Sequence, residues 1–239
     1  MNAQEAEKKL GEIQSRWGKC RSCVLHESSE GVVTAAMYTA PDLSGRGGAW
    51  ALVIGEIPSK KADDEGNLLA GKYGAIVEDM LLAAGIRRAI VTTVVACRPS
   101  RAATPKPDQI QACNPRLVEL VDAVKPAAVI CLGKVASKVV DAGLKKGRRN
   151  LVKRISRATV VDPAVWISKK LPLDELEEQK EKVVAKLLRL AKRAKLDVDV
   201  VHEGVGECAH DFTEVGAWTG TPRHEDVISV CRNCTEIAA

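Results

Sequence analysis

The stretch from Gly55 to Gly74 (GEIPSKKADDEGNLLAGKYG) constrains the fold more than any other part of the sequence. It follows an apolar run over 49–54 that is short enough for a buried strand. Gly55 and Pro58 break that strand, and apolar residues at helical spacing follow over 75–84, so the last glycines would lie at a helix N-terminus. This order predicts an open α/β sheet with a ligand or anion site where the strand ends. The same order is also common at turns without a function, so this stretch alone leaves both interpretations open.

Further segments alternate between strand-like and helical patterns. The strand-like segments are 89–95, 127–132 and 159–161, and the helical ones are 3–17, 108–124, 134–141 and 173–195. The stretch 27–48 is polar and rich in glycine, and we expect a strand-poor surface excursion there. We therefore predict a three-layer α/β/α fold with a central, mostly parallel four-stranded sheet over residues 1–196. Residues 197–239 would form a small, metal-stapled C-terminal module.

Composition and charge indicate which classes of protein are compatible with this sequence. The 239 residues are 46% hydrophobic and carry a net charge of +5, which permits contact with a polyanion without requiring it. No run of 18 apolar residues is present, and the charged N-terminus does not read as a signal peptide. We expect a monomeric cytoplasmic protein with no membrane contact. In such a chain, eight cysteines favour metal binding over disulfides.

Four of the cysteines suggest one metal centre. Cys20 and Cys23 form a C-x-x-C hook after the first predicted helix, and Cys97 and Cys113 follow with 15 residues between them. The hook alone could be a redox pair or a chance spacing. Because two more cysteines follow, we favour a metal site that ties the N-terminal hook to the core.

The tail carries a second metal signature. Cys208 and His210 form one half of it, and Cys231 and Cys234 form the other, with 20 residues between the halves. Three thiolates and one imidazole suit tetrahedral zinc, and a tail of this size needs such a staple to fold. The module could be structural, bind DNA or recruit a protein partner, and the sequence does not separate these roles.

Several blocks resemble the uracil-DNA glycosylase superfamily in its iron–sulfur, family 4-like branch. Gly55–Gly74 fits the family pattern GEAPG…QG.PFVG.AG without a gap, and matching blocks follow at 92–99 (TTVVACRP), 104–113 and 125–133. The likeness runs from about Trp17 to about Lys195. It implies a DNA glycosylase with a [4Fe–4S] cluster held by Cys20, Cys23, Cys97 and Cys113. A structural zinc at these four cysteines is the alternative.

The resemblance also implies where the chemistry lies. Glu56 occupies the place of the family's turn carboxylate, whereas Leu69 replaces a stacking Phe, Thr93 an edge-reading Asn, and Asp162 a catalytic His. We expect Glu56 and Asp162 to act near the sugar and the attacking water. The residues that would form the base pocket are Gly55, Ile57, Leu69 and Thr93.

Contacts with DNA are predicted at three places. Residues 162–167 (DPAVWI) resemble the family motif HPAYLLR, in which an apolar wedge enters the duplex as the base flips out. Here the wedge would be Val165, Trp166 and Ile167, although Trp166 could equally pack in the core. The run 145–157 is rich in Lys and Arg with no acidic residue, and is either a solvated loop or a phosphate-tracking patch beside the active site. The basic residues expected to contact DNA are Lys72, Arg98, Arg148 and Arg149.

Three functions remain open on the sequence. The first is a glycosylase with altered base choice, which hydrolyses the N-glycosidic bond of a flipped damaged or deaminated base. The second is a catalytically inactive DNA-binding relative. The departures from the family pattern at Leu69, Thr93 and Asp162 would explain its loss of activity. The third is a structural or adaptor protein that recruits a partner through its tail.

Overall fold

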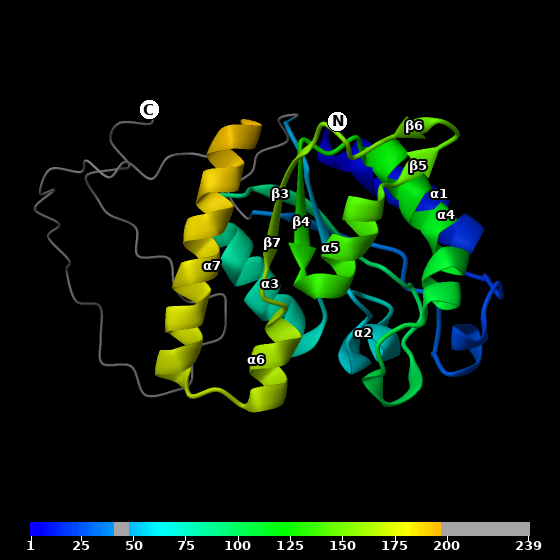
Figure 1. Ribbon diagram of the computed structural model, residues 1–239, viewed down its shortest axis with the longest axis horizontal. Helices are drawn as coiled ribbons and strands as arrows, with labels where there is room; N and C mark the ends of the chain where they lie inside the picture. Colours follow the sequence, from blue (N-terminus) through cyan, green and yellow to red (C-terminus); the bar gives the residue numbers. More distant parts are fainter. Residues whose placement is uncertain (41–47, 197–239) are drawn as a thin grey trace, which may run out of the picture. The chain divides into compact units, whose positions relative to one another are not determined.

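A single mixed sheet forms the centre of the protein. The computed structural model describes residues 1–40 and 48–196. The sheet has five strands in the order β1-β3-β2-β4-β7 (Figure 1). The strands are β1 (Ala36–Thr39), β2 (Ala51–Gly55), β3 (Arg88–Thr93), β4 (Ala128–Leu132) and β7 (Ser156–Val160). Neighbours from β3 to β7 are parallel and β1 is antiparallel to β3, which confirms the mostly parallel α/β fold.

The number of strands corrects the prediction of four. The fifth strand, β1, lies in the stretch that we expected to be a strand-poor surface excursion. It is an edge strand of four residues, in which Tyr38 is buried and Thr39 is exposed. An edge strand this short carries too little alternation to stand out from the polar, glycine-rich residues around it.

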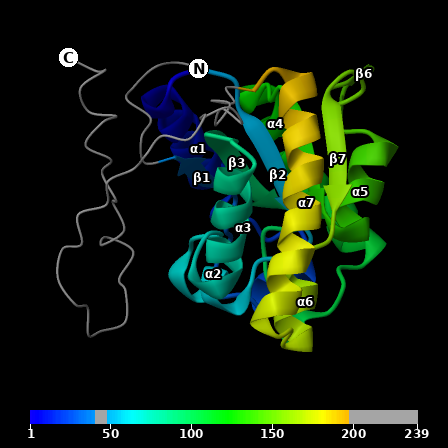
Figure 2. The same ribbon diagram turned by 90° about the vertical axis from the view of Figure 1, so that its left-hand side faces the viewer.

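Helices cover both faces of the sheet. One face carries α1 (Ala3–Trp17), α4 (Pro107–Val124) and α5 (Gly133–Ala142), and the other carries α3 (Gly71–Ala83), α6 (Pro163–Lys169) and α7 (Leu173–Ala194). Figure 2 shows α3 and α7 side by side on the second face. Successive residues of β2 point to opposite sides, so Val53 packs under α3 and α7 whereas Leu52 packs under α1 and α4. No helix within these ranges is long and apolar enough to cross a membrane.

The topology separates two ends of the sheet. The four parallel strands all finish at one edge, here called the carboxyl edge, where Gly55, Thr93, Gly133 and the residues after Val160 lie. Helix α5 starts at this edge and returns to the opposite end before β7 begins. The hairpin of β5 (Lys145–Lys146) and β6 (Arg149–Asn150) therefore lies at the amino end of the sheet, away from α6 (Figure 1).

The hairpin's position corrects one prediction. Arg148 and Arg149 are exposed, as a phosphate-binding patch requires, but they lie at the opposite end of the sheet from the carboxyl edge. The sequence predicts the positive charge of the run 145–157 but not its location, because helix α5 carries the chain back to the amino end of the sheet. These two arginines are therefore not beside the candidate active site.

Candidate active site and cysteine cavity

The turn after β2 brings the first predicted site residues to the carboxyl edge. Gly55 ends β2 in register with Thr93, which ends β3. Glu56 follows directly and is half-buried. The chain then forms the short helix α2 (Lys60–Glu65), whose N-cap Ser59 accepts a hydrogen bond from the backbone N–H of Ala62 at 3.0 Å. Glu56 is thus fixed between a buried strand and a capped helical turn.

Tyr73, in the first turn of α3, reaches back over the end of β2. A Cβ atom added to Gly55 would lie 3.0 Å from the Tyr73 hydroxyl, so a larger residue here would require the phenol to move by a few tenths of an ångström. Gly74 is constrained more tightly, because its Cβ would lie 1.8 Å from the backbone carbonyl oxygen of Leu69. These two glycines allow the loop to fold back and place an aromatic hydroxyl at the carboxyl edge.

Asp162 completes this cluster from the far side. It is the N-cap of α6, and its Oδ1 accepts a hydrogen bond from the backbone N–H of Ala164 at 2.8 Å. Its own Cβ lies 3.4 Å from the position that a Cβ on Gly133 would occupy. The Tyr73 phenol is hydrogen-bonded to the Asp162 carboxyl group. The ends of β2, β4 and β7 therefore meet at one hydrogen-bonded pair.

The surroundings of Asp162 and Tyr73 favour the protonated form of both side chains. Burial raises the pKa of Asp162 from 3.8 to about 6, and the negative charge of Glu56 adds to the rise. The hydrogen bonds from Ala164 and Tyr73 act in the opposite direction. Burial and the nearby Asp162 also raise the pKa of Tyr73 well above its usual range, so the phenol stays protonated. Asp162 consequently changes charge just below neutral pH.

The predicted base-pocket residues are only partly brought together. Thr93 lies beside Gly55, but it is 3% exposed and its hydroxyl donates to the carbonyl oxygen of Val95 at 2.8 Å. Leu69 packs partly buried on the α3 side of the sheet, whereas Ile57 packs with the cluster on the α4 side. Leu69, Thr93 and Ile57 as base-pocket residues thus remain predictions.

Sequence reasoning missed Tyr73. The family pattern quoted above has Ala at this position, directly before the final glycine, so a departure in size was visible in the sequence. Because the protein has only two tyrosines and one phenylalanine, a tyrosine near the turn was a second visible sign. The hydrogen bond to Asp162 could not be foreseen, since 88 residues separate the two positions.

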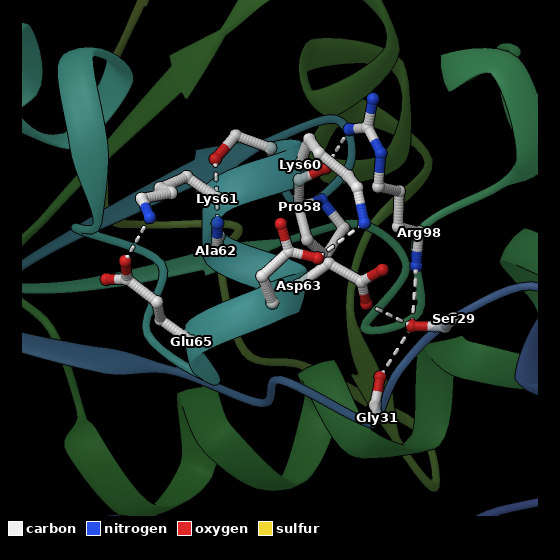
Figure 3. Close-up of polar contacts among 11 residues, drawn as sticks. Ser29, Gly31, Pro58, Lys60, Lys61, Ala62, Asp63, Glu65 and Arg98 are labelled. Atoms are coloured by element: carbon white, nitrogen blue, oxygen red, sulfur yellow. Dashed lines mark hydrogen bonds and ion pairs between the residues drawn. The ribbon is translucent and has the colours of Figure 1, made fainter.

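A set of polar contacts ties the turn to the loop that carries Cys97 (Figure 3). The Arg98 guanidinium donates to the carbonyl oxygen of Pro58 at 2.7 Å. Ser29 accepts the backbone N–H of Arg98 at 3.1 Å and donates to the buried carboxylate of Asp63 at 2.5 Å. Part of the Arg98 side chain that we predicted for DNA contact is thus engaged within the protein. Lys72, in contrast, is exposed at the start of α3.

The four predicted ligand cysteines line one small cavity, here called the cysteine cavity. All four are free thiols, and Cys97 is the most buried of them at 8% exposed. The backbone N–H of Ala96 donates to the Cys113 sulfur at 3.4 Å. Burial, followed by the neighbouring Cys113, Cys23 and Cys20, raises the pKa of Cys97 to about 12. The hook after α1 and the two distant cysteines thus line the same cavity, and their role as metal ligands stays a prediction.

The donor set has the chemistry that an iron–sulfur cluster requires. Such clusters are held by Cys thiolates, and four free thiols line this cavity. In the described part of the chain, no three His, Cys, Asp or Glu side chains already form a group that could hold a metal ion.

The burial of Trp166 shows that its predicted place in the apolar wedge was wrong. It is 4% exposed and packs in the core beneath α7, so it does not lie on the surface that would meet DNA. Ile167 also packs partly against this core, whereas Val165 is 41% exposed. The helical period of α6 explains the difference, because adjacent residues of a helix point in different directions.

The predicted zinc ligands lie outside the described residues. They are Cys208, His210, Cys231 and Cys234. Zinc at these positions stays a prediction from their spacing.

Comparison with known proteins places the chain in a family. The sequence model of the uracil DNA glycosylase superfamily matches residues 45–190, and the chain belongs to this superfamily. A Type-4 uracil-DNA glycosylase from Archaeoglobus fulgidus is 29% identical over 133 residues, which are 55% of this chain and 63% of the relative. Type-4 uracil-DNA glycosylases from Pyrobaculum aerophilum and Thermotoga maritima are each 28% identical, over 51% and 56% of this chain. The matches span 59% and 66% of those two relatives, so the chain covers about three fifths of their length.

Proposed function

We propose that this protein is a DNA glycosylase that hydrolyses the N-glycosidic bond of a flipped uracil or other deaminated or damaged base and leaves an abasic site. The observation that carries the proposal is the cluster of Glu56, Tyr73 and Asp162 at the carboxyl edge of a superfamily member's sheet. In open α/β sheets this edge is where ligands bind. DNA would be the substrate, as the names of the relatives suggest.

The two carboxyl groups suit the charge that develops in this reaction. As the glycosidic bond breaks, the bond electrons leave with the base and the sugar becomes cationic. An ionised carboxylate held nearby stabilises that cation and can orient a water for attack on the sugar. Asp162 is mostly ionised at neutral pH, and Tyr73 holds it by a hydrogen bond. We therefore assign charge stabilisation to Asp162 and positioning of the water to Glu56.

The cysteine cavity supports a [4Fe–4S] cluster as a structural cofactor. Cys20 and Cys23 would hold it from the segment after α1, Cys97 from the loop after β3, and Cys113 from α4. When bound, the cluster joins these segments through thiolate bonds and takes no part in base removal. Since Arg98 follows Cys97 and donates to Pro58, the bound cluster would also steady the turn that carries Glu56.

A strand-nicking assay after alkali tests the activity. Single- and double-stranded oligonucleotides would carry uracil, hypoxanthine or a mismatch, and wild type would be compared with Glu56→Ala. Glu65→Ala is the matched control, because Glu65 is an exposed glutamate at the end of α2 that forms an ion pair with Lys61. Cleavage lost in Glu56→Ala and kept in Glu65→Ala would support the proposal and identify the base.

A catalytically inactive DNA-binding relative is the second candidate. It is favoured by Thr93, whose hydroxyl is already bonded to Val95, and by Tyr73, which takes space that the family pattern leaves to Ala. No cleavage of any substrate, together with salt-sensitive DNA binding, would replace the first proposal with this one. Asp162→His should then raise uracil excision if the site still accepts a base. An adaptor role for the tail would require a protein partner that binds residues 197–239.

A further inference from the structure

Arg116 of α4 is a buried cation whose hydrogen-bond partners in the described residues carry no negative charge. It is 1% exposed, and its guanidinium donates to the carbonyl oxygens of Thr34 at 2.6 Å and Thr93 at 2.5 Å. A third bond goes to the Thr92 hydroxyl at 2.9 Å. All three acceptors are neutral, and within residues 1–40 and 48–196 no carboxylate forms an ion pair with Arg116.

This arrangement is costly unless a negative charge is nearby. A guanidinium remains protonated at any ordinary pH, and burying an unpaired charge carries a large desolvation penalty. The Nε–H of Arg116 is also buried and has no hydrogen-bond partner among the described residues. Native proteins rarely leave such a donor unused, so an unsatisfied buried N–H indicates a missing partner.

The cysteine cavity is where that partner would lie. Arg116 lines this cavity together with Cys20, Cys23, Cys97 and Cys113. It follows Cys113 by three residues on α4, a spacing that puts both side chains on the same face of the helix. A positive charge therefore faces the place where four thiolates would gather.

We propose that Arg116 is the built-in countercharge of the thiolate-bound cluster, which it helps to retain and whose reduction potential it raises. The inference rests on the proposed [4Fe–4S] cofactor. Four thiolates around a doubly positive iron–sulfur core leave a net charge of about −2, and one-electron reduction makes it about −3. A fixed cation stabilises the reduced form more than the oxidised form, so the potential rises.

Three variants separate charge from structure. Arg116→Met keeps much of the side-chain volume and removes the charge, whereas Arg116→Lys keeps the charge and loses part of the hydrogen bonding. Arg148→Met is the matched control, because it removes the same charge from an exposed position at the amino end of the sheet. Each protein would be purified anaerobically for iron content, visible absorbance and a redox titration followed by electron paramagnetic resonance.

The proposal predicts a more negative midpoint potential for Arg116→Met than for wild type, a value near wild type for Arg116→Lys, and no change for Arg148→Met. If Arg116→Met fails to retain iron while Arg116→Lys retains it, the charge requirement is supported as well. Equal potentials in wild type and Arg116→Met, or equal shifts or equal loss of iron in both Arg116 variants, would overturn the proposal. A colourless wild type without iron would instead refute the proposed cofactor itself, and the inference with it.

Discussion

Asp162→Asn should make the protein more stable at neutral pH while it removes activity. The Asp162 carboxylate is held in a half-buried position beside Glu56, where its pKa is about 6 instead of 3.8. At about 1.36 kcal/mol per pH unit, this difference corresponds to an upper limit of about 3 kcal/mol of destabilisation. Partial solvent exposure reduces the expected gain to about 1–2 kcal/mol. Asn caps a helix about as well as Asp, so the bond to Ala164 should survive.

The raised pKa of Asp162 also determines how its contribution to folding stability changes with pH. Between about pH 4 and pH 6, the folded protein keeps a proton on Asp162 that the unfolded chain has lost. Wild-type stability from this group therefore falls as the pH rises through that window and is constant above it. The advantage of Asp162→Asn should be complete at pH 8 and about half as large at pH 5.

Thermal unfolding of the iron-loaded protein at pH 8 and pH 5 measures this effect. For a domain of this size, about 1–2 kcal/mol corresponds to an increase of roughly 2–8 °C in Tm. Asp174→Asn is the control, because Asp174 is an exposed aspartate in the first turn of α7 and should give no gain. An Asp162→Asn protein that is no more stable than wild type at pH 8, or equally stabilised at both pH values, would refute the reasoning.

Three further outcomes follow from the same structure. The rate of base excision should fall as the pH drops through about 6, where Asp162 becomes protonated. Tyr73→Phe should move this fall in rate to higher pH, because the phenol's hydrogen bond lowers the pKa of Asp162. An unchanged pH profile would contradict the role given to Tyr73. Gly74→Ala should cost about 3 kcal/mol or more, measured by urea unfolding, since the new Cβ would lie 1.8 Å from the Leu69 carbonyl oxygen; near-normal stability would show that the loop can move aside. Cys97→Ala, purified anaerobically, should lose the broad visible absorbance of an iron–sulfur cluster, and a variant as brown as wild type would remove Cys97 from the ligand set.

The sequence predicted the parallel core well because that core is simple. Residues 51–55, 88–93 and 128–132 are buried throughout, and strands covered on both faces appear as continuous apolar or β-branched runs. The helices α1, α3, α4, α5 and α7 have amphipathic patterns and lie within a few residues of the predicted ranges, whereas the short helices α2 and α6 were not predicted. The edge strand β1 was missed because one buried side chain, Tyr38, does not make a recognisable period.

Site residues were predictable where a local motif sets their place. Glu56 follows a strand and Asp162 starts a helix, so both lie at the carboxyl edge as a consequence of the chain's local structure. Residues whose role depends on distant partners were not predictable. Arg116 would be expected on the solvent side of an amphipathic helix, and only its contacts with Thr34 and Thr93 show that it is buried.

The contact between Gly55 and Tyr73 couples two positions of the site. A Cβ atom at position 55 would lie 3.0 Å from the Tyr73 hydroxyl, so Ala at this position would require the phenol to move by a few tenths of an ångström. Because the phenol interacts with Asp162, such a movement should also change the pKa of Asp162. A designer who wishes to enlarge this site should begin at position 73, where the family pattern has Ala.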